Sequence, residues 1–115
     1  MQITKFCEEY KQIYFDIMIK KVYISGPITG HDIEERKAAF GNIQEYLESR
    51  GFNVVNPLSE NGYDPNKSYE QYMRDDLKLL LDCDYIYLMA GWDNSKGCQA
   101  EYLVALTCGI SILGD

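Results

Sequence analysis

Asp76 is the residue whose surroundings fit its chemistry least well. Three and four positions away stand the apolar side chains of Tyr72, Met73, Leu79 and Leu80. A helix over this segment therefore places the carboxylate on an apolar stripe, where an unpaired carboxylate costs free energy. Either the group accepts a hydrogen bond from a backbone amide or a tyrosine hydroxyl, or it serves a chemical function that this helix alone does not reveal.

A second carboxylate and a serine stand near the start of the last predicted helix. Glu101 falls in the first turn, where free amides and the helix dipole favour an ionised carboxylate. A simple bias toward acidic residues at helix N-termini explains this position equally well. Ser95, followed by Lys96 and Gly97, either caps the helix or helps its free amides hold an anion such as a phosphate.

Two loops complete the set of residues that could bind a ligand. The glycines of Gly26-Pro-Ile-Thr-Gly30 permit turns and the close approach of a ligand. Trp92, in a second polar loop, either stacks on a base or covers the core. Ligands of parallel sheets bind beyond the carboxyl ends of the strands. The loops after Ile24, Asn56 and Met89 are therefore the candidate site.

The apolar pattern predicts the elements that position these residues. Strands are expected at 22–25, 52–56, 85–89 and 110–113, helices at 33–50, 68–82 and 98–108, and loops at 57–67 and 91–97. Alternating strands and helices predict an α/β fold with a small doubly wound parallel sheet of about four strands in flavodoxin-like order.

The first 17 residues form an appendage in this interpretation. Their apolar residues recur at steps of three and four, which predicts an amphipathic helix over 1–17. Met18 then leads directly into the first strand and reads as a second, natural start. We therefore expect an α/β domain over 18–115, with the first helix packed on it or used for self-association.

Composition narrows the class of partner. The formal net charge of −7 opposes binding to nucleic acid or to an anionic membrane, so a small molecule is the expected partner. The four cysteines show neither metal-ligand spacing nor the density of a secreted disulfide scaffold. We expect free thiols in a reducing, cytoplasmic location, and no signal peptide or membrane span.

Three separated motifs together resemble the nucleoside 2-deoxyribosyltransferase superfamily. They are Lys21-Val-Tyr-Ile-Ser-Gly-Pro-Ile-Thr-Gly30, Asp76-Leu77 and Ser95-Lys-Gly-Cys-Gln-Ala-Glu-Tyr-Leu-Val-Ala105. The resemblance covers about residues 20–113. It is closest to a small, little-characterised branch near the 2′-deoxynucleoside 5′-phosphate N-hydrolases, with the same Gly-Pro-x-Thr-Gly turn and Gly-Trp-x-x-Ser segment.

The resemblance implies a role for each catalytic candidate. Glu101 matches the nucleophile that attacks the anomeric carbon and forms a covalent glycosyl-enzyme. Asp76 matches the aspartate that contacts the base and assists proton transfer to the leaving nitrogen. Tyr23 matches the tyrosine that orients the nucleophile. This is the scheme of retaining glycosidases, and it requires no metal or organic cofactor. The implied substrate-binding residues are Ser25, Gly26, Pro27, Thr29, Gly30, Trp92, Ser95 and Gly97.

The substrate and the second acceptor are less constrained. Ser95 matches a serine of the nucleotide N-hydrolases, which favours (deoxy)nucleoside 5′-monophosphates, but Thr29 stands where that branch has an arginine. Water as acceptor gives hydrolysis and a second base gives transfer. We expect an N-glycosidase or deoxyribosyltransferase, and a homodimer or larger homo-oligomer by resemblance. The alternatives are a catalytically silent nucleotide-binding or sensing module, or cleavage of a nicotinamide nucleotide.

In the superfamily, residues beyond the last core strand reach into a neighbouring subunit's site, whereas this sequence ends at Asp115. The site is therefore expected to be either completed in a different way or incomplete.

Overall fold

The structure is a computed structural model that describes residues 20–114. The helix predicted over 1–17 lies outside the described residues. The elements in chain order are β1 (Lys21–Ser25), α2 (Ile33–Ser49), β2 (Asn53–Val55), α3 (Pro57–Asn61), α4 (Tyr69–Leu81), β3 (Tyr85–Leu88), the 3-10 helix η1 (Trp92–Asn94), α5 (Lys96–Thr107) and β4 (Ser111–Gly114).

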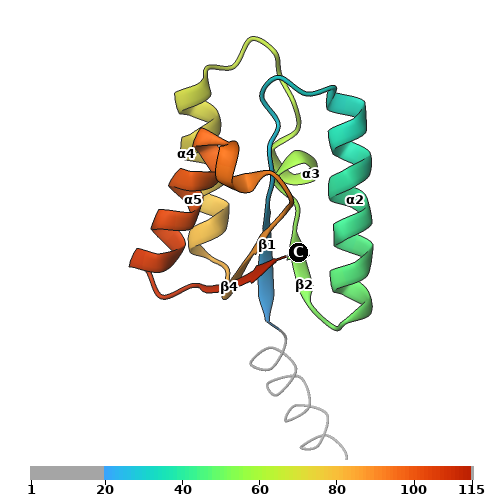
Figure 1. The fold of residues 1–115 in the computed structure, drawn as a ribbon, viewed down its shortest axis with the longest axis vertical. Coiled ribbons are helices and arrows are strands. Elements are labelled where there is room, and N and C mark those ends of the chain that lie inside the picture. The colour runs from blue at the N-terminus through green and yellow to red at the C-terminus, as the bar shows by residue number, and fades with distance from the viewer. Residues whose placement is uncertain (1–19, 115) are drawn as a thin grey trace, which may run out of the picture.

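The four strands form one parallel sheet in the order β2-β1-β3-β4. Figure 1 shows α2 on one side of this sheet and α4 and α5 on the other. The predicted α/β fold, doubly wound with flavodoxin-like strand order, is therefore confirmed. None of the helices within residues 20–114 has both the length and the apolar character that crossing a membrane requires.

Alternation along the strands explains why both faces of the sheet are covered. Val22 and Ile24 of β1 pack in one buried cluster with Phe40 of α2, whereas Tyr23 packs in a second cluster with Leu80 of α4. Successive side chains of a strand point to opposite faces. A continuous apolar strand is therefore what a sheet buried on both faces needs.

The strand order reverses between β1 and β3, which are hydrogen-bonded to each other in register. The chain leaves β1 toward α2 on one face of the sheet and leaves β3 toward α5 on the other face. The loops 26–32 and 89–95 therefore part at the carboxyl edge of the sheet. This is the place where ligands bind in open parallel sheets.

The segment 57–67, expected to be a loop, contains the short helix α3, so that expectation is wrong for its first five residues. Asn56 starts the helix, because its side-chain oxygen accepts a hydrogen bond from the amide of Leu58 at 3.1 Å. Pro57 occupies the first helical position, where its missing N–H has no cost. A loop-like composition thus concealed an ordinary helix start.

Helix α5 begins at Lys96, two residues earlier than predicted. Ser95 is its N-cap, and its hydroxyl accepts a hydrogen bond from the amide of Cys98 at 3.3 Å. Glu101 consequently lies in the second turn, so the expectation of a first-turn carboxylate stabilised by free amides is wrong. Another explanation for a carboxylate at this position is needed.

Candidate active site

Glu101 is a buried carboxylate held by two hydroxyl groups of β1. Its side chain is 5% exposed. The Tyr23 hydroxyl donates to Oε2, and the Ser25 hydroxyl donates to Oε1 at 2.8 Å. Tyr23 and Ser25 are two positions apart on one strand, so they point to the same face of the sheet, toward α5. Each carboxylate oxygen thus has its own donor.

Burial dominates the electrostatics of this cluster. Desolvation raises the pKa of Glu101 from 4.5 to about 7, the hydrogen bonds from Tyr23 and Ser25 oppose that rise, and the charge of Asp76 adds to it. Burial, followed by the charge of Glu101, raises the pKa of Tyr23 well above its usual value. The tyrosine therefore remains a protonated hydrogen-bond donor.

Asp76 lies on α4 and lines a pocket of about 330 Å³. Its partner is a side-chain amide, because Nδ2 of Asn61 donates to Oδ1 of Asp76 at 2.9 Å. Burial raises the pKa of Asp76, whereas the hydrogen bond from Asn61 and the charge of Lys67 lower it. The carboxyl group on the apolar stripe of α4 therefore faces a pocket rather than the core.

The pocket lies between the loop after β1, the segment around α3 and the start of α4. Its lining residues are Gly26, Ile28, Thr29, Gly30, His31, Ile33, Pro57, Leu58, Gly62, Tyr63, Asp64, Pro65, Lys67, Tyr69, Tyr72, Met73, Asp76 and Ser95. The rings of Tyr63 and Tyr72 stack with centroids 6.4 Å apart. Two stacked tyrosine rings in the same pocket as a carboxyl group are a suitable environment for a planar heterocyclic base.

Gly26 allows the loop after β1 to approach the core closely. A Cβ at this position would lie 2.5 Å from Sδ of Met89 and 3.1 Å from Cζ of Phe40. The loop can therefore run directly over the end of the sheet only because this residue has no side chain. The close approach of a ligand to the Gly26–Gly30 turn stays a prediction.

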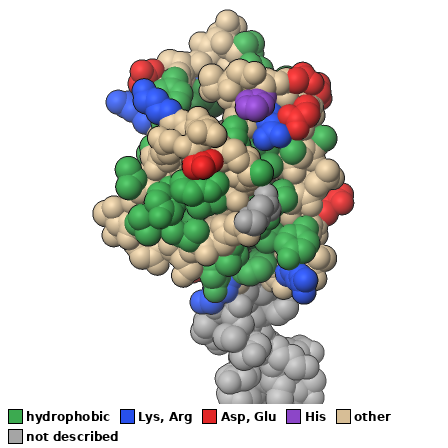
Figure 2. Space-filling model, in the orientation of Figure 1, with side chains coloured by type: hydrophobic (Ala, Val, Ile, Leu, Met, Phe, Trp, Pro, Cys, Tyr) green, Lys and Arg blue, Asp and Glu red, His purple; other side chains and the backbone are tan. Residues whose placement is uncertain are grey.

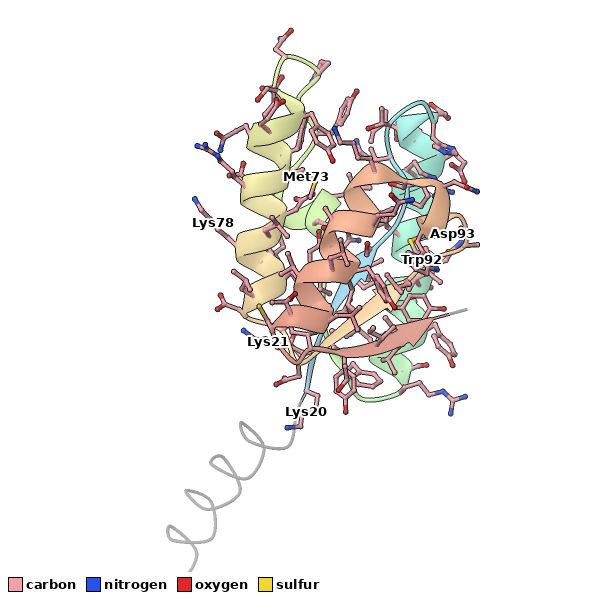
Figure 3. All side chains as sticks on the ribbon, turned by 60° about the vertical axis from the view of Figure 1, so that its left-hand side comes forward. Lys20, Lys21, Met73, Lys78, Trp92 and Asp93 are labelled. Atoms are coloured by element: carbon pink, nitrogen blue, oxygen red, sulfur yellow. The ribbon has the colours of Figure 1, made fainter. Side chains whose placement is uncertain are left out.

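A second hollow of about 570 Å³ adjoins the pocket and shares four of its lining residues, which are Thr29, His31, Tyr69 and Ser95. Pro27 and Gly97 line this second hollow. Trp92 lines neither of the two; its ring packs against Tyr102 with centroids 4.9 Å apart. In Figure 3, Met73 comes from α4 on one side of α5, whereas Trp92 lies on the other side.

The structure thus separates the predicted residues into two groups. Tyr23, Ser25 and Glu101 form the buried hydrogen-bonded cluster, and the other predicted residues except Trp92 line the two hollows. Glu101 itself is not among the residues that line either hollow. Among residues 20–114, no group of three or more His, Cys, Asp and Glu side chains is arranged to hold a metal ion.

A family model described as "Domain of unknown function (DUF4406)" matches residues 20–114. The chain belongs to this family. DUF4406 is a family of the nucleoside 2-deoxyribosyltransferase superfamily, so the relationship expected from the three motifs is confirmed. A search of curated protein sequences found no match to this DUF4406 chain.

Two solved structures share the fold of this DUF4406 domain. A 2-deoxyribosyltransferase from the psychrotolerant bacterium Bacillus psychrosaccharolyticus is 19% identical, with a TM-score of 0.61 over 82% of this chain and 70% of that protein. A conserved protein from Enterococcus faecalis V583 is 18% identical, with a TM-score of 0.62 over 84% of this chain and 62% of that protein.

Sequence reasoning missed most of the pocket lining, including Tyr63, Tyr69 and Tyr72, and it missed Asn61, the hydrogen-bond partner of Asp76. Tyr72 was read as part of the apolar stripe that makes Asp76 unusual, although it lines the same pocket. Tyr63 and Asn61 belong to the segment after β2, which approaches the carboxyl edge of the sheet. Three tyrosines close together, Tyr63, Tyr69 and Tyr72, were the available signal.

Proposed function

We propose that this DUF4406 chain cleaves the N-glycosidic bond of a (deoxy)nucleoside 5′-monophosphate through a covalent glutamyl–sugar intermediate. The observation that carries the proposal is the Glu101 carboxylate, buried near the pocket and held by hydroxyl groups on both oxygens. Two neutral donors orient the carboxylate without neutralising it, as a nucleophile requires.

The proposed reaction needs two carboxyl groups in opposite protonation states. Ionised Glu101 attacks the anomeric carbon, the bond from that carbon to the base nitrogen breaks, and Asp76 gives its proton to the departing base. Water or a second base then attacks the anomeric carbon and breaks its bond to Glu101. The attacking molecule gives a proton to Asp76, which returns both carboxyl groups to their starting states. The raised pKa of Asp76 suits the acid. Burial raises the pKa of Glu101 to about 7, and the hydrogen bonds from Tyr23 and Ser25 oppose that rise and favour the ionised nucleophile.

In the proposed reaction, side chains must move before the substrate can reach Glu101. The carboxylate is 5% exposed and is not part of the pocket lining. Met73 does line the pocket, and its sulfur would lie 3.4 Å from a Cβ placed on Gly97 of α5. An unbranched methionine side chain adapts easily to a ligand. Binding of the nucleoside must therefore rearrange the side chains around Glu101.

The buried state of Glu101 is also the observation that favours a second candidate function. A module that binds nucleotide without turnover would need the pocket and not an accessible nucleophile. The deciding experiment incubates the protein with nucleosides, deoxynucleosides and their 5′-monophosphates, with and without a free acceptor base, and separates the products by chromatography. Release or exchange of base supports the enzyme. Binding by calorimetry with no product supports the silent module.

Replacing Asp76 by asparagine should lower the rate of base release by about 10²-fold or more, because a positioned general acid contributes on that scale. The matched control is Asp75→Asn, one position away on α4, where the carboxylate bonds to Gln71 and Lys67 and does not line the pocket. Rates are compared for each natural base. Equal losses in both variants would contradict an acid role for Asp76.

Self-association is part of the proposal. Figure 2 shows hydrophobic side chains gathered over α5, and Leu103 and Leu106 on this helix are 60% and 51% exposed. Exposed leucines one turn apart support an interface between copies of the chain. Sedimentation should give a dimer or larger assembly that Leu103→Gln weakens. A monomer at high protein concentration would contradict this.

A further inference from the structure

The second hollow differs from the first in its charge. Among the residues that line it, Arg36 and Lys96 are basic and none is acidic. The first pocket, by contrast, is lined by two carboxylates, Asp64 and Asp76, and by one cation, Lys67. In a chain of net charge −7, a hollow lined by cations and free of carboxylates attracts an anionic group.

Arg36 is the anchor of this hollow. Its side chain is 13% exposed. Nη1 donates to the carbonyl of Pro27 at 3.3 Å, while Nε and Nη2 donate to Glu35 at 2.6 and 2.7 Å. A guanidinium carries five N–H donors, so two have no partner among the described residues. The bond to Pro27 ties this helix residue to the loop after β1, where it is held ready for a ligand.

Lys96 and Tyr69 form the opposite side of the hollow. The Lys96 ammonium lies 5.1 Å from the centroid of the Tyr69 ring, a cation–π contact that positions the charge without neutralising it. Tyr69 lines both hollows, as does Ser95. A ligand that extends from the first pocket into the second therefore passes beside these two residues.

The size of the hollow indicates more than one phosphate. Pockets of roughly 300–1,000 Å³ take whole drug-sized ligands, and this one measures about 570 Å³. Lys96 lines it with no carboxylate partner among the described residues, and Arg36, although paired with Glu35, keeps two N–H groups for the ligand. One phosphate group would leave most of this space empty.

We propose that the second hollow binds a 5′-linked diphosphate, with Arg36 as the residue that selects it. The ligand class is a nucleoside whose 5′ oxygen carries two consecutive phosphates, either a nucleoside 5′-diphosphate or a dinucleotide. The proposal rests on the proposed function only in placing the base in the first pocket. Arg36 of α2 supplies the charged contact that Thr29, in the loop after β1, cannot make.

The test measures Kd by calorimetry on the Glu101→Gln protein, which excludes turnover. Paired 5′-monophosphates and 5′-diphosphates of adenosine, guanosine, cytidine and uridine are the probes, together with inorganic pyrophosphate and phosphate. The diphosphate should bind about 10-fold more tightly than its monophosphate for the accepted base, and pyrophosphate more tightly than phosphate. Arg36→Gln should abolish both differences. Circular dichroism verifies that the variant is folded, and Lys96→Gln provides a second, independent reduction.

Lys37→Gln is the matched control, because it removes one positive charge from α2 at a residue that does not line the hollow. It should leave the preference for diphosphate unchanged. Equal affinity for mono- and diphosphates, or equal effects of Arg36→Gln and Lys37→Gln, would overturn the proposal. A dinucleoside diphosphate that binds as tightly as the nucleoside diphosphate identifies the dinucleotide as a ligand, and weaker binding identifies the nucleoside diphosphate.

Failure of this inference and failure of the proposed function give different results. Base release from monophosphates, with no preference for diphosphates, leaves the enzyme and removes the diphosphate site. A preference for diphosphates that depends on Arg36, in a protein that releases no base, leaves the binding site and removes the enzyme.

Discussion

Replacing Glu101 by glutamine should reduce base release by at least about 10³-fold, because removal of a covalent nucleophile eliminates the step on which turnover depends. Glutamine has nearly the shape of glutamate, so the packing between β1 and α5 is retained. The Tyr23 hydroxyl can still donate to the amide oxygen, and Ser25 can accept from the amide nitrogen. The measurement is initial rate on the best substrate of the nucleotide panel, with nucleotide affinity determined in parallel.

The affinity of Glu101→Gln for nucleotide is the control for this experiment. Glu101 does not line the pocket, so nucleotide should bind to Glu101→Gln about as tightly as to the unaltered chain. Lost activity with retained affinity identifies a group that acts on the bond being broken. Lost affinity would instead show that the variant disturbs the pocket, and activity that survives the substitution would contradict a glutamyl intermediate.

The architecture was predictable because local patterns determine it. Apolar runs marked all four strands, and serines marked two helix starts: Ser68 accepts from the amide of Gln71 at 3.1 Å, and Ser95 caps α5. The segment Ser68-Tyr-Glu-Gln71 has the sequence pattern of a capping box, but only half of the box forms. The Gln71 side chain donates to Asp75 at 2.9 Å instead of returning to the cap. Asp75 and Ser68 are both close to Gln71 in sequence. The sequence pattern cannot decide which of them the Gln71 side chain contacts.

The site was only partly predictable because its contacts are distant in sequence. Glu101 is separated from Tyr23 by 78 positions and from Ser25 by 76. Family resemblance indicated the tyrosine, whereas no periodicity or spacing could indicate the serine as a second donor. Asn61 reaches Asp76 from a helix that composition concealed. Arg36 falls in a charged stretch of α2, where an arginine usually faces solvent.

The pH dependence of protein stability should report on the protonation of Glu101. The pKa of Glu101 is raised from 4.5 to about 7 in the folded chain, so between these values the folded state holds a proton that the unfolded state has lost. The free energy of unfolding therefore falls as pH rises through this window, by about 3 kcal/mol in total, and is constant above it. Below the window, Glu101 makes no difference.

Glu101→Gln lacks this titration, so the stability of the variant relative to the unaltered chain should rise by about 2–3 kcal/mol between about pH 5 and about pH 8. Urea unfolding of both proteins at each pH measures the difference, in which the other titrating groups largely cancel. Tyr23→Phe removes a donor that favours the ionised form of Glu101. The free energy of unfolding of this variant should therefore fall by more as pH rises, and the fall should continue to a higher pH. A flat difference would mean that the two hydroxyl groups keep Glu101 ionised at pH 5. A variant that is more stable at neutral pH and inactive would show that burial of this carboxylate opposes folding, which is expected of a residue kept for catalysis and not of a structural one.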